Sequence, residues 1–271
     1  VYNEVDSLLL LFDRIECALG ELSYTYEIIF VDDGSTDGGI DVLRELGRKH
    51  DHVGLIALRR NFGKAKALDA AFAQASGRMI CTMDADLQDD PDEIGKLISK
   101  LESGYDLVCG WKVDRQDPTH KVFASRIFNR LLSWISGLDL HDFNTGLKVF
   151  YARTIEDVRL YGEMHRFLPV FVAAQGYRVS ELPVVHHARE FGESKYGLER
   201  LPKGFFDLLT ILLTTRFHSR PLHLFGLVGL GFGAFGALLL SYLSVLWFLD
   251  LGPIGTRPLF FLGILLVVVG L

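Results

Sequence analysis

Six acidic residues lie within ten positions of this chain, in the stretch MDADLQDDPDEI at residues 83–94. No basic residue lies among them, so their carboxylates repel one another unless a cation or a helix N-terminus offsets the charge. Asp84 and Asp86 follow an apolar run two residues apart, so both side chains face one side of an extended strand end. Magnesium takes oxygen ligands, commonly one or two carboxylates completed by water and phosphate oxygens. The pair therefore predicts a divalent metal site, to which Gln88 would add a carbonyl oxygen.

The later acids of this stretch have a different explanation. Asp90 has the position of a helix N-cap, Pro91 that of the first helical residue, and Glu93 that of the reciprocal acid of a capping box. Asp92 and Glu93 would then lie at the positive end of the helix dipole. We expect these acids to begin a helix and to need no ligand.

A second acidic segment, VDDGSTD at residues 31–37, also follows a strand-like run. A glycine turn that leads to a helix capped by Ser35 or Asp37 is a common connection between a strand and a helix in α/β proteins. That role does not use Asp33. An acid at the carboxyl end of a strand can accept hydrogen bonds from ribose hydroxyls or from a base N–H.

The elements that would position these acids alternate along the chain. Because strands alternate with helices, we expect right-handed βαβ units and an α/β fold with a mostly parallel sheet. Ligands bind such sheets beyond the carboxyl ends of the strands, where both acidic segments lie. The predicted strands are residues 27–31, 53–58, 78–83, 105–109, 147–151 and 177–185, and the predicted helices are residues 5–20, 38–50, 64–76 and 92–103.

Charge and cysteine content narrow the class of protein. The net charge of −6 argues against a nucleic-acid binder that relies on neutralising phosphates. The three cysteines, Cys17, Cys81 and Cys109, are far apart and form no C-x-x-C pair. We expect them to be buried, reduced thiols in a cytosolic domain.

The end of the chain has the composition of a membrane segment. Residues 224–249 form a run of 26 residues without a charge, long enough to span a bilayer, and residues 258–271 form a shorter one. We expect a hairpin whose second helix is cut off. The segment 198–217 is apolar but charged at intervals, which fits either a helix in the membrane interface or an ordinary docking helix.

The flanking charges predict the orientation. Arg216, His218 and Arg220 precede the first span, whereas Arg257 alone lies in the loop after it. Under the positive-inside rule, residues 1–220 are cytoplasmic. The chain opens at VYNE without an initiator methionine, so we expect a fragment that lacks most of its first strand.

One motif in the uncharged run is misleading. Residues 231–236, GFGAFG, match G-x-G-x-x-G, but no strand precedes them and no suitable acid follows, so a dinucleotide site is excluded. Gly229 and Gly233 instead form a G-x-x-x-G face for helix packing.

Taken in order, the motifs resemble those of family 2 glycosyltransferases. They are VYNE, VDDGSTD, RRNFGKAKAL, DADLQDDP, NTGLKVF, EMHRFLP, GYRVSELPVVHHAREFGESKYG and RPLHLFGLVGLG, which together cover essentially the whole chain. More narrowly, the chain resembles the polyprenyl-phosphate glycosyltransferases, such as the dolichol-phosphate mannose synthases and bacterial lipid-phosphate glucosyltransferases. The resemblance implies a GT-A fold, a nucleotide-sugar donor such as GDP-mannose or UDP-glucose, Mg²⁺ or Mn²⁺, and a polyprenyl- or dolichyl-phosphate acceptor.

The resemblance also implies roles for individual residues. Asp84, Asp86 and Gln88 match the motif for metal and diphosphate. Asp33 matches the acid that contacts the nucleotide, with Tyr2 and Glu4 at a neighbouring strand end. Near the sugar, the resemblance implies Asp142 and Asn144.

The acceptor phosphate would be held by basic and hydroxyl side chains, each of which has the alternative role of a solvated surface residue. Arg166, beside His165, would line the active-site side. A loop flanked by Gly192 and Gly197 would approach the acceptor. The candidates are Arg115, Lys121 and Ser125, with Lys112 and Arg126 as weaker ones, then Arg166, and Ser194, Lys195 and Tyr196 in the glycine-flanked loop.

The resemblance implies an inverting hexosyltransferase, which we expect at the cytoplasmic membrane surface. The acceptor phosphate is largely a dianion near neutral pH, so no general base is required. The metal would stabilise the departing diphosphate, with Arg115 and Lys121 aligning the acceptor. Two alternatives are a processive polysaccharide synthase, whose Q-x-x-R-W signature is absent from the sequence, and a tethered, non-catalytic sugar-nucleotide binder. We expect a catalytic domain at 1–197, interfacial helices at 198–221 and a membrane hairpin at 222–271. The interfacial helices and the G-x-x-x-G face are compatible with a homo-oligomer.

Overall fold

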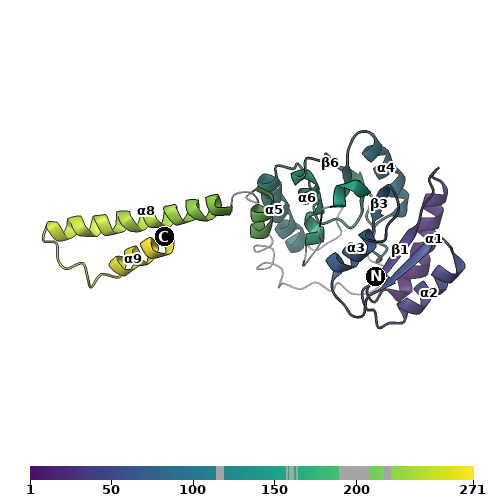
Figure 1. Ribbon diagram of the computed structural model, residues 1–271, viewed down its shortest axis with the longest axis horizontal. Coiled ribbons are helices and arrows are strands. Elements are labelled where there is room, and N and C mark those ends of the chain that lie inside the picture. The colour runs from purple at the N-terminus through teal and green to yellow at the C-terminus, as the bar shows by residue number, and fades with distance from the viewer. Residues whose placement is uncertain (114–118, 157, 159–161, 163, 189–207, 217–220) are drawn as a thin grey trace. The chain divides into compact units, whose positions relative to one another are not determined.

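The structure is a computed structural model that describes residues 1–113, 119–156, 158, 162, 164–188, 208–216 and 221–271 (Figure 1). For residues 119–127, 216 and 221 it describes the backbone alone. The chain divides into two units, Val1–Thr215 and Arg216–Leu271. Most of the segment 198–221 lies outside the described residues, so the bounds of the three predicted domains stay predictions.

The strands of the first unit form two sheets. β1 (Ile28–Asp32) pairs in parallel with β2 (Val53–Ala57). The second sheet has the order β3-β5-β4-β6, in which β5 (Lys148–Tyr151) is antiparallel to both neighbours and β6 (Val179–Val184) is parallel to β4. β5 lies between β3 (Met79–Thr82), which is an edge strand, and β4 (Leu107–Lys112), which lies inside the sheet.

All six predicted strands are confirmed within a few residues. The expected α/β fold is confirmed, and β5 alone among the described strands runs against its neighbours, entering between β3 and β4 in the opposite direction. An apolar run such as LKVFY indicates burial on both faces of a sheet, but its pattern carries no information about strand direction.

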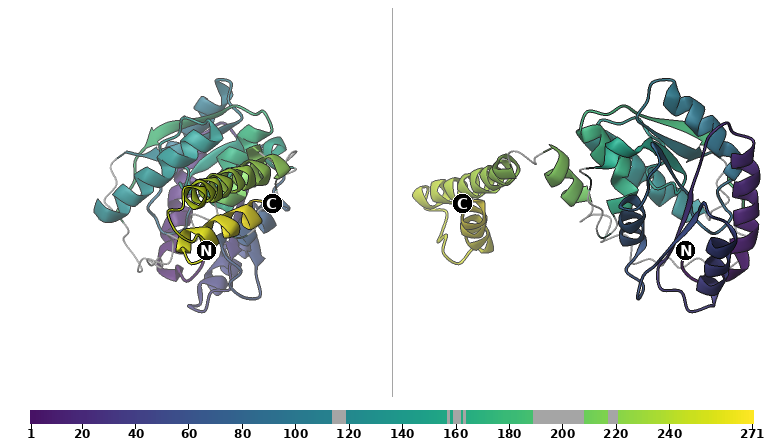
Figure 2. Two further views of the ribbon diagram at one scale, coloured as in Figure 1. Left: turned by 90° about the vertical axis from the view of Figure 1, so that its left-hand side faces the viewer. Right: turned by 45° about the vertical axis from the view of Figure 1, so that its right-hand side comes forward.

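Four helices precede or separate the early strands, and all four are predicted from the sequence. They are α1 (Val5–Gly20), α2 (Gly39–Lys49), α3 (Lys64–Phe72) and α4 (Ile94–Glu102), the last preceded by the short 3₁₀ helix η1 (Pro91–Glu93). α1 and α2 lie together beside β1 (Figures 1 and 2). Leu8, Phe30 and Leu43 form the core between them, together with Leu87 from the loop after β3.

The rest of the first unit packs around β4 and β5. Its helices are α5 (Thr119–Ser136), η2 (Ala152–Ile155), η3 (Met164–Phe167) and α6 (Leu168–Ala174), followed later by the single-turn η4 (Leu212–Arg216). Phe143, Phe150 and Phe167 are fully buried in this second core.

A cavity of about 1080 Å³ separates β1 from β3. Apolar side chains such as Phe30 and Ile80 line its body, and Asp84 lies at its polar end. Val1 lies beside the end of β1, where its nitrogen donates to Val31 O over 2.8 Å and its oxygen accepts from Asp33 N over 2.9 Å. Val1 thus pairs with β1 as a neighbouring parallel strand would.

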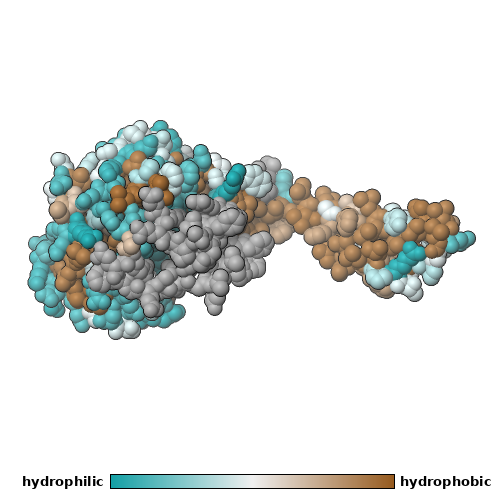
Figure 3. All heavy atoms as spheres, turned by 180° about the vertical axis from the view of Figure 1, so that it is seen from behind, coloured by the Kyte–Doolittle hydropathy of each residue, from teal (hydrophilic) through white to brown (hydrophobic). Residues whose placement is uncertain are grey.

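The second unit contains two apolar helices, α8 (Pro221–Phe248) and α9 (Pro258–Gly270), whose surface is almost entirely hydrophobic (Figure 3). Residues 222–248 are long and apolar enough to cross a membrane, with a mean hydropathy of 2.0, whereas α9 has 13 residues. At 1.5 Å per residue α9 covers about 20 Å, short of the roughly 30 Å hydrocarbon core. A multi-pass arrangement therefore stays a prediction.

Glycines bring α8 and α9 into close contact. A Cβ atom on Gly229 would lie 2.7 Å from Gly270 O, and one on Gly236 would lie 2.7 Å from Gly263 O. The predicted G-x-x-x-G face thus packs against α9 within one chain, as small residues allow at helix interfaces.

All three cysteines are free thiols. Cys109 is buried, as predicted, but Cys17 and Cys81 are exposed, so the prediction of burial is wrong for them. Cys17 lies on the solvent side of α1 and Cys81 points from β3 toward the cavity. Alternation along an amphipathic element decides such exposure.

Candidate active site

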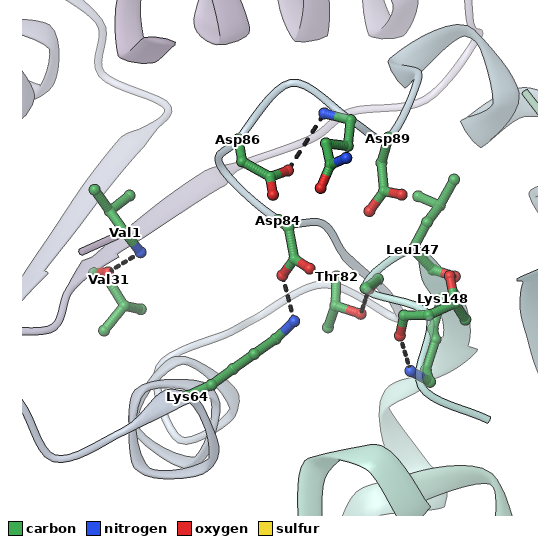
Figure 4. Close-up of polar contacts among 12 residues, drawn as sticks. Val1, Val31, Lys64, Thr82, Asp84, Asp86, Asp89, Leu147 and Lys148 are labelled. Atoms are coloured by element: carbon green, nitrogen blue, oxygen red, sulfur yellow. Dashed lines mark hydrogen bonds and ion pairs between the residues drawn. The ribbon is translucent and has the colours of Figure 1, made fainter. Parts of the chain in front are cut away.

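The acidic loop begins one residue after β3 and ends at η1. It brings three carboxylates together, those of Asp84, Asp86 and Asp89 (Figure 4). Asp86 and Asp89 are buried, with 9% and 2% of their surface exposed, whereas the Asp84 side chain keeps 36%. The turn between Asp86 and Asp89 is tight. Gln88 N donates to Asp86 Oδ1 over 3.3 Å, and Leu87 has a φ of +60°.

Gly146, just before β5, packs directly against two of these acids. A Cβ atom at this position would lie 2.5 Å from Asp84 Oδ2 and 2.9 Å from Asp89 Oδ2. Its carbonyl accepts a hydrogen bond of 2.8 Å from Thr82 Oγ1, which fixes the glycine to the end of β3. The space around both carboxylates therefore depends on the missing side chain.

Lysines from three different elements lie near the acids, and Figure 4 shows two of them, Lys64 and Lys148. Lys64, at the start of α3, forms an ion pair with Asp84. Lys112, at the end of β4, places its Nζ 3.1 Å from Asp89 Oδ1. Lys148 of β5 is 4% exposed and donates to Thr145 O.

Neighbouring cationic groups lower the pKa of two of the acids, Asp84 and Asp89. Burial by itself would raise the pKa of Asp84, but the ammonium groups of Lys64, Lys112 and Lys148 outweigh it and hold that pKa well below its usual value. Burial likewise opposes ionisation of Asp89, yet His186 and Lys112 keep its pKa lowered. Both carboxylates are therefore anions at neutral pH, as metal ligands must be.

The helix start after the loop is partly as predicted. Asp90 accepts a hydrogen bond of 3.0 Å from Asp92 N, and Pro91 occupies the first position of η1, so the predicted cap is confirmed. The prediction that Glu93 is the reciprocal acid of a capping box is wrong. Its side chain is buried and accepts a hydrogen bond of 2.8 Å from Lys96 Nζ. A 3₁₀ turn precedes α4, and its tighter winding carries Glu93 away from the cap.

Asp33 holds a loop beside the site. Its two carboxylate oxygens accept hydrogen bonds from Phe62 N at 2.7 Å and Gly63 N at 2.9 Å. These bonds set the loop from which Lys64 begins α3. The cavity that Asp84 lines is also lined by Asp33, Tyr2 and Glu4. The contact of these three residues with a nucleotide stays a prediction.

The structure also describes two further predicted pairs. Asp142 is buried and accepts a hydrogen bond of 3.0 Å from the backbone of the exposed Asn144. His165 lines the cavity, and burial, with the charges of Lys64 and Arg166, lowers its pKa to about 3. This imidazole is therefore neutral at physiological pH.

Several predicted acceptor residues lie outside the described residues. Neither the structure of the loop with Gly192 and Gly197 nor the position of Arg115 is described, and for α5 residues before 128 the side chains are not described. The residues concerned are Arg115, Lys121, Ser125, Arg126, Ser194, Lys195 and Tyr196.

Sequence reasoning does not single out four residues that the structure brings to the acids. Asp89 stands beside Asp90 in the sequence and is easily assigned to the helix start. The position of Lys64 could have been predicted to lie near the site, since Lys64 follows a glycine beyond the carboxyl end of a predicted strand. Lys148 and Gly146 carry none, because their proximity to the acids comes from the antiparallel insertion of β5.

The donor set suits a hard cation. Asp84, Asp86 and Asp89 offer carboxylate oxygens only, and Asp89 Oδ2 accepts no hydrogen bond from the described residues. Mg²⁺ and Mn²⁺ prefer such oxygen ligands over the nitrogen and sulfur ligands that select softer ions. The kind of ligand atom therefore fits a divalent metal, which would draw the three carboxylates to within 4.8 Å of one another.

Comparison with known proteins defines the class. The family model described as glycosyl transferase family 2 matches residues 1–157. This chain belongs to that family and is a glycosyltransferase. A dodecaprenyl-phosphate galacturonate synthase of Rhizobium johnstonii is 40% identical over 272 residues, covering 98% of this chain and 80% of that protein.

Two other similar proteins extend the comparison. An undecaprenyl-phosphate 4-deoxy-4-formamido-L-arabinose transferase of Yersinia pestis is 39% identical over 254 residues, 93% of this chain and 76% of that protein. Glucosyl-3-phosphoglycerate synthase of Mycobacterium tuberculosis, solved with Mn²⁺ and UDP-glucose, superposes with a TM-score of 0.58 at 17% identity, covering 79% of this chain and 76% of that one. The last likeness supports the GT-A fold alone.

Proposed function

We propose that this glycosyltransferase transfers a sugar from a nucleotide-diphosphate donor to a polyprenyl phosphate. The observation that carries the proposal is the oxygen-only cluster of Asp84, Asp86 and Asp89 at the carboxyl end of β3 in a chain whose relatives are named for polyprenyl-phosphate products. Their names also bear on the donor, since they specify galacturonate and formamido-arabinose in place of mannose or glucose.

The acids would hold the donor through a divalent metal. Asp84, Asp86 and Gln88, with Asp89 behind them, would bind Mg²⁺ or Mn²⁺, which supplies charge stabilisation for the departing diphosphate. Tyr2, Glu4 and Asp33 would bind the nucleotide at the same cavity, with Asp142 and Asn144 near the sugar.

Cationic side chains would bring the second anion alongside the first. Arg166 would contact the acceptor phosphate, together with Arg115, Lys121, Ser125 and Lys195. The acceptor phosphate is itself the nucleophile and is ionised near neutral pH, so the site needs no general base. His165 is neutral, which leaves it free to accept or donate a hydrogen bond without adding charge. Direct attack from the face opposite the diphosphate would invert the anomeric carbon.

The apolar second unit would keep the enzyme at the membrane that carries the lipid. α8 would span the bilayer with the catalytic unit on the cytoplasmic side, and α9 would form the returning arm of a hairpin.

Product analysis tests this proposal. The full chain in membranes would be given UDP-galacturonic acid, a UDP-linked formamido-arabinose, UDP-glucose and GDP-mannose, each with undecaprenyl or dolichyl phosphate. We expect one donor to give a chloroform-soluble glycosyl polyprenyl phosphate of the matching mass, dependent on Mg²⁺ or Mn²⁺. A polymeric product would contradict the proposal. Donor binding by folded protein without transfer to any lipid phosphate would also contradict it.

A further inference from the structure

A second cluster of potential metal ligands lies at the other end of β1 and β2. Glu16 projects from α1, His50 follows the end of α2, and His52 directly precedes β2. One ligand atom from each lies within 4.8 Å of the others, a spacing that the carboxylates of Asp84, Asp86 and Asp89 do not reach. The acidic loop follows β3, whereas this cluster precedes β2, so the two clusters adjoin opposite ends of their strands.

The backbone fixes both histidines. His50 N donates to Leu46 O over 3.0 Å as α2 ends, and Val53 N returns a 3.0 Å bond to His50 O. His52 O accepts from Ile28 N over 2.9 Å, which ties it to the start of β1. The two imidazoles therefore emerge from a rigid turn, one residue apart.

Aromatic neighbours orient the three side chains. The His50 ring lies 4.7 Å from the ring of Phe12, and the His52 ring meets Tyr26 edge-on at 5.3 Å. The Tyr26 hydroxyl donates to Glu16 Oε1 over 3.1 Å, and His52 Nε2 lies 2.8 Å from the same oxygen. An outer hydrogen bond that holds a ligating carboxylate in place is typical of metal sites.

We propose that Glu16, His50 and His52 form a site for a divalent transition metal, best satisfied by Zn²⁺. Zinc binds imidazole nitrogen and carboxylate oxygen at about 2.0–2.2 Å, so tetrahedral ligands lie about 3.4 Å apart. The present spacing reaches that value through small side-chain shifts. Three protein ligands leave the fourth position for water, and the metal joins α1 to the turn between α2 and β2.

The ligand chemistry separates this site from the acidic loop. Imidazole ligands favour Zn²⁺, Ni²⁺ and Cu²⁺ over Mg²⁺ and Mn²⁺, whereas a cluster of carboxylates alone favours the hard ions. Zinc uptake here is therefore independent of the acids at the end of β3. Because the metal binds the folded state, it also raises the unfolding temperature.

Metal titration of the full chain tests the proposal. Metal-stripped protein in detergent is titrated with Zn²⁺ against a chromogenic chelator, and with Co²⁺ to record the visible absorption of a tetrahedral ion. We expect one tightly bound ion per chain that is lost in His50→Ala and in His52→Ala. Tyr26→Phe, which removes only the outer hydrogen bond, should weaken binding by about tenfold to a hundredfold.

Two control variants make the test specific. His141 forms an ion pair with Glu181 and belongs to no such three-residue group, so His141→Ala should leave zinc binding unchanged. The double variant Asp84→Asn, Asp86→Asn should also retain it. Failure of folded wild-type protein to bind Zn²⁺ would overturn the proposal, as would equal loss in either control. If the histidine variants do not fold, the wild-type Co²⁺ spectrum and Tyr26→Phe still decide the outcome.

Discussion

The acidic loop after β3 and the histidine cluster before β2 differ in the atoms they offer. The loop after β3 presents oxygen ligands, buried and surrounded by lysines, whereas the cluster of Glu16, His50 and His52 presents two imidazoles held by aromatic rings. The number of acidic residues in a cluster is thus a poor guide to the metal that the cluster prefers. The donor atoms and the charges around them decide it.

The clusters also differ in what a cation must displace. Lys64 pairs with Asp84, and Lys112 pairs with Asp89, so a metal in the acidic loop competes with charges of the protein itself. At the histidine cluster, the side chains contact one another and Tyr26. Ions bound among carboxylates and lysines should exchange readily, which suits a metal that accompanies a substrate diphosphate.

Removing one acid should have the largest effect. Asp84→Asn or Asp86→Asn keeps the side-chain shape but removes a charged ligand, and we expect kcat to fall by about 10²–10³-fold. Metal-dependent transfer to polyprenyl phosphate measures the loss, with zinc binding as the internal control for folding. Full activity in either variant would show that the loop is not the donor site.

Adding one carbon beside the acids should have a smaller effect. In Gly146→Ala, the new Cβ would meet Asp84 Oδ2 and Asp89 Oδ2 within 3 Å, so both carboxylates must move. A displacement of about 1 Å costs on the order of 10²-fold in rate. Gly20→Ala is the matched control, since nothing lies within 4 Å of its Cβ and its activity should not change.

Removing the competing charge should change metal affinity more than it changes the fold. Lys64→Gln takes away the ammonium group that pairs with Asp84. We expect the Mg²⁺ or Mn²⁺ concentration for half-maximal activity to fall by about tenfold, since a like charge at that distance opposes the ion by roughly 1–4 kcal/mol. An unchanged or higher activation constant would mean that Lys64 does not compete with the metal.

A carboxylate far from both clusters should affect stability alone. Asp106 accepts hydrogen bonds from Arg178 N at 2.9 Å and Arg153 Nη2 at 2.8 Å; burial opposes its ionisation, but these partners keep its pKa lowered. Asp106→Asn should reduce the free energy of unfolding by about 1.5–3 kcal/mol, with transfer activity per folded molecule unchanged.

The pH dependence gives that prediction its sign. Since the folded-state pKa of Asp106 lies below the unfolded value of about 3.9, its stabilisation is complete above that value and is lost as the pH falls through the folded pKa. Denaturant unfolding should therefore show a smaller difference between wild type and Asp106→Asn in acid than at neutral pH. A constant difference would contradict the assignment.

Local patterns in the sequence predict most of the fold and part of the site. The strand ends, the pair Asp84 and Asp86 and the cap Asp90 all follow from spacing within a few residues. Lys148 and Gly146 reach the acids only because β5 runs antiparallel between β3 and β4, a pairing that depends on contacts distant in the sequence. The histidine cluster is equally long-range, because 34 residues separate Glu16 from His50.

Leu87 connects the acids mechanically to the core beneath α1 and α2. It is 1% exposed in the same core as Leu8 and Leu43, and its left-handed backbone costs on the order of 1–3 kcal/mol. That burial overcomes the strain, so the turn between Asp86 and Asp89 cannot relax without withdrawing a leucine from the interior. The alignment of the carboxylates is consequently tied to the integrity of the N-terminal core, and damage to that core should disable the enzyme before it unfolds.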